Sequence, residues 1–301
     1  MNKNSKIIII IIISILLFSC SKKANSNDNL PIRDNNPQVL IPTADKELIV
    51  ENKGGSIDYS NNDQGYVVVE YKGSKKAKLQ IRCPSDNVYT YSLNGGLEVF
   101  PLTEGDGKYT ITINENRSGK SYYVILAVTI DVKLVNEFSP FLYPNQYVNF
   151  NESTKQIEKG KEVVEGAKTE LEVVEKVYNY VIGNISYDFD KATSVKSGYT
   201  PIIDKVIEEG KGICFDYAAV MASILRSQRI PTRMDIGYVQ DVYHAWISVY
   251  ISDVGWINGI IEFDGVSWKL MDPTFEDSKS IFDSISQFVG DGSNYLTKYR
   301  Y

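Results

Sequence analysis

The chain has 301 residues, of which 43% are hydrophobic and 23% are charged, and its formal net charge is −6 at pH 7. An acidic balance argues against nucleic-acid binding, because proteins that bind nucleic acids need a basic face to neutralise phosphates. The length and hydrophobic content suffice for two domains of ordinary size, and the sequence contains no internal repeats.

The first 20 residues predict an exported, lipid-anchored protein. Two lysines precede an apolar run from Ile7 to Phe18, which is shorter than the roughly 20 residues that a membrane-spanning helix needs. The ending "LLFSC" resembles the lipobox of bacterial lipoproteins, in which the cysteine carries the lipid. We therefore expect residues 1–19 to be a lipoprotein signal peptide and Cys20 to anchor the chain on the extracytoplasmic face of the cell membrane. The alternative is an ordinary signal peptide in which Cys20 has no role.

Two segments of different character follow. Residues 20–45 are rich in Asn, Asp and Ser without an apolar period, which predicts a flexible stalk. Residues 46–135 alternate Val, Ile, Tyr and Thr with period two, and turn signals such as Asn94-Gly95-Gly96 separate several of the runs. About seven short strands of this kind predict an antiparallel β-sandwich of immunoglobulin-like type. We find no chemical site in it and interpret it as a spacer or docking module.

Residues 136–301 read as helices followed by an antiparallel sheet, which is an α+β order of elements. Helices are predicted from about 153 to 164, after the capping box of Thr169 and Glu172, from Pro201 to Gly210, and from Cys214 onward. The runs "TRMDIGYV", "YHAWISVYI", "WINGIIEF" and "VSWKLMDPT" predict four strands. The last two are joined at Asp264-Gly265, a strong hairpin signal.

The three cysteines have different expected roles. Cys20 is assigned to the lipid, and Cys83 alternates with Leu79 and Ile81 on one strand face, which is typical of a small core residue. A disulfide between Cys83 and Cys214 is the ordinary alternative in an oxidising compartment. If this disulfide is absent, Cys214 is either an inert thiol or a reactive thiol with a function.

Cys214, His244 and Asp272 together could form a nucleophilic site. His244 is the only histidine, and a lone histidine is more often structural than catalytic. Here it shares a strand face with Trp246 and Ser248, while Asp272 closes the run "WKLMDPT". A helix N-terminus and an imidazolium both stabilise a thiolate, and a carboxylate on the other imidazole N–H orients the ring. Backbone N–H groups after the Gly210-Lys211-Gly212 turn could stabilise an oxyanion.

The same residues carry a family resemblance. The segments "GKGICFDYAAVMASILRSQRIPTRMDIGY", "YHAWISVYI" and "WKLMDPT" resemble, in this order, the three core motifs of the transglutaminase-like superfamily. The preceding "VEKVYNYVIGNISYDFDKA" is similar to the segment that leads into that core. The resemblance covers roughly residues 150–275. It implies a papain-like fold with a Cys-His-Asp triad at Cys214, His244 and Asp272, and acyl transfer through a thioester.

We therefore expect a surface enzyme that acts on amide or peptide bonds of a protein or peptide substrate, without a cofactor or metal. Trp246, Trp268 and Tyr187 could line its acyl site or simply pack in the core. The sequence does not choose between transferase, protease and amidase. A catalytically inert lipoprotein that serves as a surface binding module or scaffold stays open as the alternative.

Overall fold

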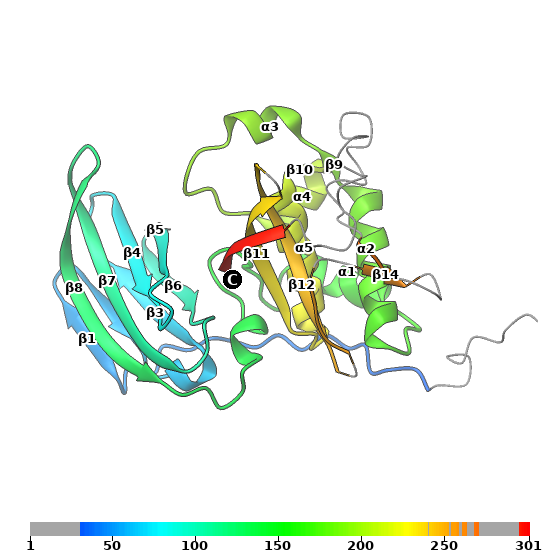
Figure 1. Cartoon of the computed structure of the whole chain (residues 1–301), viewed down its shortest axis with the longest axis horizontal. Helices are drawn as coiled ribbons and strands as arrows, with labels where there is room; N and C mark the ends of the chain where they lie inside the picture. The colour runs from blue at the N-terminus through cyan, green and yellow to red at the C-terminus, as the bar shows by residue number, and fades with distance from the viewer. Residues whose placement is uncertain (1–30, 240, 253, 259–260, 264–267, 271–294) are drawn as a thin grey trace, which may run out of the picture. The chain divides into compact units, whose positions relative to one another are not determined.

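The computed structural model describes residues 31–301 except 240, 253, 259–260, 264–267 and 271–294 (Figure 1). The chain divides into two compact units, Met1–Pro31 and Ile32–Tyr301, and the fold below is that of the second. Cys20 and Asp272, two of the predicted site residues, lie outside the described residues. Within the described ranges, no helix combines the length and apolar character needed to cross a membrane.

The predicted sandwich consists of two four-stranded antiparallel sheets. One has the order β1 (Ile49–Asn52), β2 (Gly55–Asp58), β3 (Tyr66–Tyr71), β6 (Gly96–Pro101). The other has the order β5 (Val88–Leu93), β4 (Ala77–Arg82), β7 (Gly107–Ser118), β8 (Ser121–Val132). Side chains from both sheets share one core, in which the rings of Tyr91 and Phe100 lie 4.8 Å apart. The β-rich prediction is confirmed, with one strand more than the expected seven.

The predicted helices are also present. The helices are α1 (Lys155–Val163), α2 (Glu170–Asn184), α3 (Phe189–Ser194), α4 (Ile203–Glu209) and α5 (Cys214–Ser227). The Thr169 side chain accepts a hydrogen bond from the Glu172 N–H, as a helix cap should, and Gly210 ends α4 with a φ of 61°. The short α3 was not predicted, nor was the parallel pair β9 (Ser186–Tyr187) and β10 (Lys211–Gly212). The helical and β segments together give the α+β fold class that the sequence predicts.

The C-terminal sheet differs from the expected one. Its order is β13 (Gly255–Asn258), β12 (Val242–Ile251), β11 (Thr232–Val239), β16 (Tyr295–Arg300), with every pair antiparallel. Figure 1 shows β16 in red beside β11. The run "WINGIIEF" contains two strands rather than one. Its second half, β14 (Ile261–Phe263), pairs with β15 (Trp268–Leu270) and not with β12.

Part of the predicted stalk is bound to the folded unit. The backbone N–H of Arg33 donates to the carbonyl of Ala167 at 3.1 Å, and that of Gln38 donates to the carbonyl of Ser227 at 2.7 Å. A chain held by backbone hydrogen bonds is not a free linker. The part of the segment around Arg33 and Gln38 is held by the folded unit, and the extent of the stalk over 20–45 stays a prediction.

Arg226 joins four segments at the centre of the unit. Its side chain lies within the core, and its guanidinium donates to the carbonyls of Thr232, Tyr143 and Tyr301 at 2.7 to 3.0 Å. Burial lowers its pKa to about 9. These bonds hold α5, the connector after the sandwich, β11 and the segment after β16 in one arrangement.

Two hydrogen bonds link the sandwich to β16. Thr103 donates its hydroxyl to the carbonyl of Arg300 at 2.9 Å, and the Arg300 N–H donates to the Tyr89 hydroxyl at 3.2 Å. Both ends lie within the compact unit Ile32–Tyr301. The division into a sandwich over 46–135 and a second domain over 136–301 stays a prediction.

Candidate active site

Cys214 is the first residue of α5, as the sequence predicts. It is half-buried, and both it and Cys83 are free thiols, so the alternative of a disulfide between them is wrong. The residue before it, Ile213, has no side-chain oxygen and cannot cap the helix. The N–H groups of Cys214 and Phe215, at the first two helical positions, have no acceptor within the helix. These two donors and the helix dipole favour an anion at this point.

A buried carboxylate closes the same helical turn. Asp216 is 0% exposed, and its carboxylate accepts hydrogen bonds from the Ile213 N–H at 2.8 Å, from the Lys191 Nζ at 2.7 Å and from the Tyr199 hydroxyl at 2.5 Å. Burial, followed by the bond to Asp216, raises the pKa of Tyr199, which keeps the phenol protonated and able to donate. The sequence analysis did not identify Asp216. The available signal was an acid at the third helical position, where a capping box places one.

Gly212 allows this arrangement. A Cβ at this position would lie 2.8 Å from the Asp216 Cβ and 3.3 Å from the Val206 Cγ1. The carbonyl of Gly212 accepts the Asp188 N–H at 2.9 Å, and the Asp188 carboxylate in turn caps α3 by accepting the Lys191 N–H at 2.8 Å. The second glycine of "GKGIC" is therefore required by the close approach of Asp216.

His244 lies on β12, where it is paired with Gly237 of β11. Its side chain is 4% exposed, and its ring stacks near that of Trp246, with centroids 6.2 Å apart and an interplanar angle of 20°. Trp246 is equally buried and meets the ring of Tyr295 at 4.8 Å. The structure thus gives Trp246 a packing contact with His244 and Tyr295.

Helix α5, which begins at Cys214, packs against the strand that carries His244. Burial raises the pKa of Tyr243, and the neighbouring phenols of Tyr299 and Tyr238 and the thiol of Cys214 raise it further. Tyr243 directly precedes His244 on β12, and α5 contacts this strand. The side chains of Tyr243 and His244 point to opposite faces of the strand, so this contact places Cys214 near β12 but not beside the imidazole.

The remaining predicted site residues are less informative. Tyr187 on β9 is half-buried and packs against the ring of Phe189 at 4.8 Å, which agrees with the packing alternative. Trp268 begins β15, whose described partner is β14. Asp272, expected just beyond β15, lies outside the described residues, as does Cys20. In the part of the chain that is described, no three His, Cys, Asp or Glu side chains gather to hold a metal ion.

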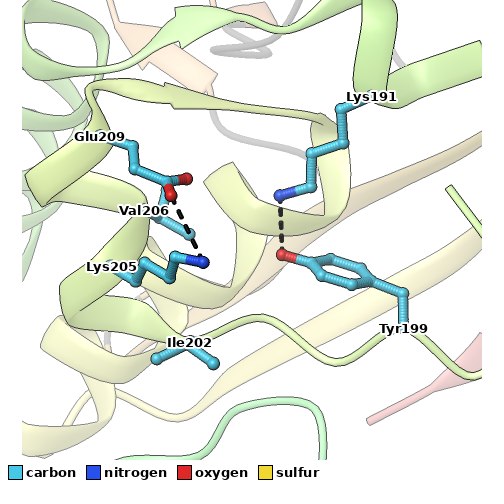
Figure 2. A pocket seen from close by; sticks show the side chains of 6 residues that line it. All are labelled: Lys191, Tyr199, Ile202, Lys205, Val206 and Glu209. Atoms are coloured by element: carbon cyan, nitrogen blue, oxygen red, sulfur yellow. Dashed lines mark hydrogen bonds and ion pairs between the residues drawn. The ribbon is translucent and has the colours of Figure 1, made fainter. Parts of the chain in front are cut away.

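A pocket of about 210 Å³ lies beside the start of α5 (Figure 2). It is lined by Lys191, Tyr199, Ile202, Lys205, Val206 and Glu209. The Lys191 Nζ donates to the Tyr199 hydroxyl at 2.7 Å, and Lys205 pairs with Glu209 at 3.4 Å. Because Lys191 and Tyr199 also bond to Asp216, the pocket wall is connected to the helical turn that carries Cys214.

Comparisons with known proteins identify the class of this region. Residues 157–259 match the family model described as the transglutaminase-like superfamily. These residues, which include Cys214 and His244, are therefore similar to that superfamily. The match ends before Asp272.

Individual relatives are distant. The curated UPF0252 protein MJ1282 of Methanocaldococcus jannaschii is 29% identical over 140 residues, which cover 40% of this chain and only 39% of that relative. Among solved structures, a candidate cysteine protease from Cytophaga hutchinsonii is 18% identical, with a TM-score of 0.35, over 70% of this chain and 74% of that chain. Red sea bream transglutaminase is 12% identical, with a TM-score of 0.31, over 69% of this chain and 48% of that chain.

Proposed function

We propose that this chain is a surface-anchored thiol enzyme that acts on amide or peptide bonds. In this proposal Cys214 is the nucleophile, His244 is the general base and acid, and Asp272 orients the imidazole. The match of residues 157–259 to the transglutaminase-like superfamily supports the chemistry. The observation that carries the proposal is the position of the free thiol of Cys214 at the start of α5, where the first N–H groups have no acceptor within the helix.

The reaction would follow the chemistry of a thiol and an imidazole. His244 takes the proton of Cys214, and the thiolate attacks the carbonyl carbon of the substrate amide. The carbonyl oxygen becomes an oxyanion, which the N–H groups of Cys214 and Phe215 can stabilise because no helical carbonyl accepts them. Collapse of this intermediate breaks the C–N bond, and the imidazolium protonates the departing amine.

The resulting thioester has two fates. Attack by a second amine transfers the acyl group, whereas attack by water hydrolyses it. In both reactions His244 takes a proton from the attacking group, the C–S bond breaks, and the imidazolium returns the proton to the departing Cys214 thiolate. Which of them dominates depends on how well the site excludes water and admits an amine. The substrate that we propose is a protein or peptide at the cell surface, reached by a chain that Cys20 anchors through a lipid.

The first experiment tests the chemistry. The purified protein is incubated with a peptide mixture and a primary amine, and mass spectrometry scores amine incorporation against cleavage. Either product is expected from the wild-type chain, and neither from Cys214→Ala or His244→Ala. A wild-type chain that gives neither product while its fold is intact would favour the inert scaffold.

The second experiment tests the anchor. Cys20→Ala is expected to move the protein from the membrane fraction to the soluble fraction, because a lipid that is not attached cannot hold it. Ser19→Ala is the matched control and should leave the protein in the membrane fraction. Equal membrane retention of Cys20→Ala and the wild type would contradict the lipoprotein proposal.

A further inference from the structure

Asp216 and Lys191 form an ion pair two residues from the proposed nucleophile, and the mechanism above gives this pair no role. A buried carboxylate is costly unless it is paired and hydrogen-bonded. Asp216 meets both conditions, since three donors reach it and one of them is the Lys191 ammonium at 2.7 Å. The Lys191 side chain is 23% exposed and faces the pocket of Figure 2.

The carboxylate lies in the same helical turn as the thiol. It accepts the N–H of Ile213, the residue directly before Cys214. A negative charge at this place opposes formation of a thiolate, whereas the N-terminus of α5 favours it. Lys191 offsets that charge because its ammonium touches the same carboxylate oxygen that accepts the Ile213 N–H.

We propose that Asp216 is a positioning residue for Cys214 and that Lys191 is its charge partner. Asp216 fixes the first turn of α5 through the Ile213 N–H, and Lys191 prevents the carboxylate from opposing the thiolate. The inference rests on the proposed function, since it takes Cys214 as the nucleophile. It assigns Lys191, a residue of the pocket wall, a direct influence on the reactivity of the thiol.

Other charged and titratable groups lie around this turn and must be kept constant in a test. On the described elements they are Tyr199 before α4, Glu209 at the end of α4, Lys211 on β10, and Tyr243 on β12. A substitution of Tyr199 distinguishes the positioning of Asp216 from the neutralisation of its charge, because the Tyr199 hydroxyl bonds to Asp216 but carries no charge. Lys205 serves as a matched control, since it lies in the same pocket wall and pairs with the exposed Glu209 instead of Asp216.

The test is the pH dependence of the rate at which iodoacetamide alkylates Cys214 in the full chain. In Lys191→Met the midpoint of this profile should rise by about 1 pH unit or more, as an uncompensated neighbouring charge predicts. The rate at pH 7 should fall by about tenfold. Lys191→Arg should retain the wild-type midpoint, and the double variant Lys191→Met with Asp216→Asn should return toward it.

Two further variants make the result specific. Tyr199→Phe should lower the alkylation rate at every pH without moving the midpoint, and Lys205→Met should change neither the rate nor the midpoint.

The proposal is overturned if Lys191→Met keeps the wild-type midpoint, or if Lys205→Met shifts the midpoint equally. If Lys191→Met does not fold, the absence of any rate change in Tyr199→Phe overturns the positioning role. A wild-type Cys214 that alkylates no faster than an ordinary thiol would instead contradict the proposed function, while the differences between variants still test the pair.

Discussion

Asp235 of β11 and Ser248 of β12 are diagonal neighbours across the strand pair, and the Ser248 hydroxyl donates a hydrogen bond to Asp235 Oδ2. The other carboxylate oxygen, Oδ1, is buried without a hydrogen-bond partner among the described residues, and the Arg300 Nε lies 4.0 Å from it. Burial raises the pKa of Asp235 in spite of this contact. The sheet that carries His244 therefore holds a carboxylate whose charged form is unfavourable.

We expect Asp235→Asn to stabilise the fold at pH 7. The unfolded carboxyl titrates near pH 4, and the folded one retains its proton to higher pH, so the wild type loses stability as the pH rises through the folded pKa. Asparagine keeps an acceptor for Ser248 without the charge. The gain should be present at pH 7 and vanish near pH 4. Urea unfolding across this range measures it, with the exposed Asp131→Asn as control; a destabilised variant at pH 7 would contradict the expectation.

The two free cysteines should differ strongly in reactivity. Cys83 is 4% exposed, and burial raises its pKa to about 12, so almost no thiolate forms at pH 7. Cys214 is half-buried at a helix N-terminus. Iodoacetamide at pH 7 followed by peptide mapping should show at least about a hundredfold faster modification of Cys214. Comparable alkylation rates of Cys83 and Cys214 in the folded chain would argue against Cys214 as the nucleophile.

Gly212→Ala should lower the reactivity of Cys214 by displacing Asp216. The added Cβ would stand 2.8 Å from the Asp216 Cβ, and overpacking of this kind costs about 1–3 kcal/mol. We expect slower alkylation of Cys214 together with a lower melting temperature. Gly183→Ala is the control, because a Cβ there meets nothing within 4 Å, and it should be neutral or slightly stabilising. If Gly212→Ala is alkylated at the wild-type rate, the reactivity of Cys214 does not depend on the position of Asp216.

Arg226→Met should be among the most destabilising single substitutions. It leaves the carbonyls of Thr232 and Tyr143 buried without their donor, at a cost of about 3 kcal/mol or more. Arg82→Met, at an exposed arginine that pairs with Asp86 at 3.7 Å, should stay within about 0.5 kcal/mol of the wild type. Denaturant unfolding of both variants checks the difference, and equal effects would contradict the central role of Arg226.

Local signals in the sequence were sufficient for much of this structure. The cap at Thr169, the terminating Gly210 and the apolar period after Cys214 each specify a helix end or face from a few neighbouring residues, and all three are observed. The alternation of Leu79 and Ile81 likewise identified a buried strand face. Such features are predictable because the forces that produce them act within one or two turns of chain.

The features that were missed depend on contacts between distant segments. Strand β16 pairs with β11 across more than fifty residues, and no local pattern reveals that register. Asp216 was visible as an acid at the third helical position, yet its partner Lys191 lies on a short helix that the sequence analysis did not find. The sequence thus predicted the helix start at Cys214 and the strand of His244, but not the ion pair of Asp216 with Lys191.

The bonds of Arg226 also constrain the order in which this chain can fold. Its acceptors come from Tyr143, 83 residues earlier, from the nearby Thr232, and from Tyr301, 75 residues later. During synthesis, α5 emerges long before Tyr301 does, so its guanidinium cannot be buried with all its acceptors in place. At that stage the free energy of the nascent chain is lowest when Arg226 stays in water, because burial without its acceptors is costly. The core around Arg226 therefore packs only after β16 has been synthesised. The helix that begins at Cys214 would then reach its final environment at the end of folding. A partly synthesised chain would not yet have the complete packing around Cys214.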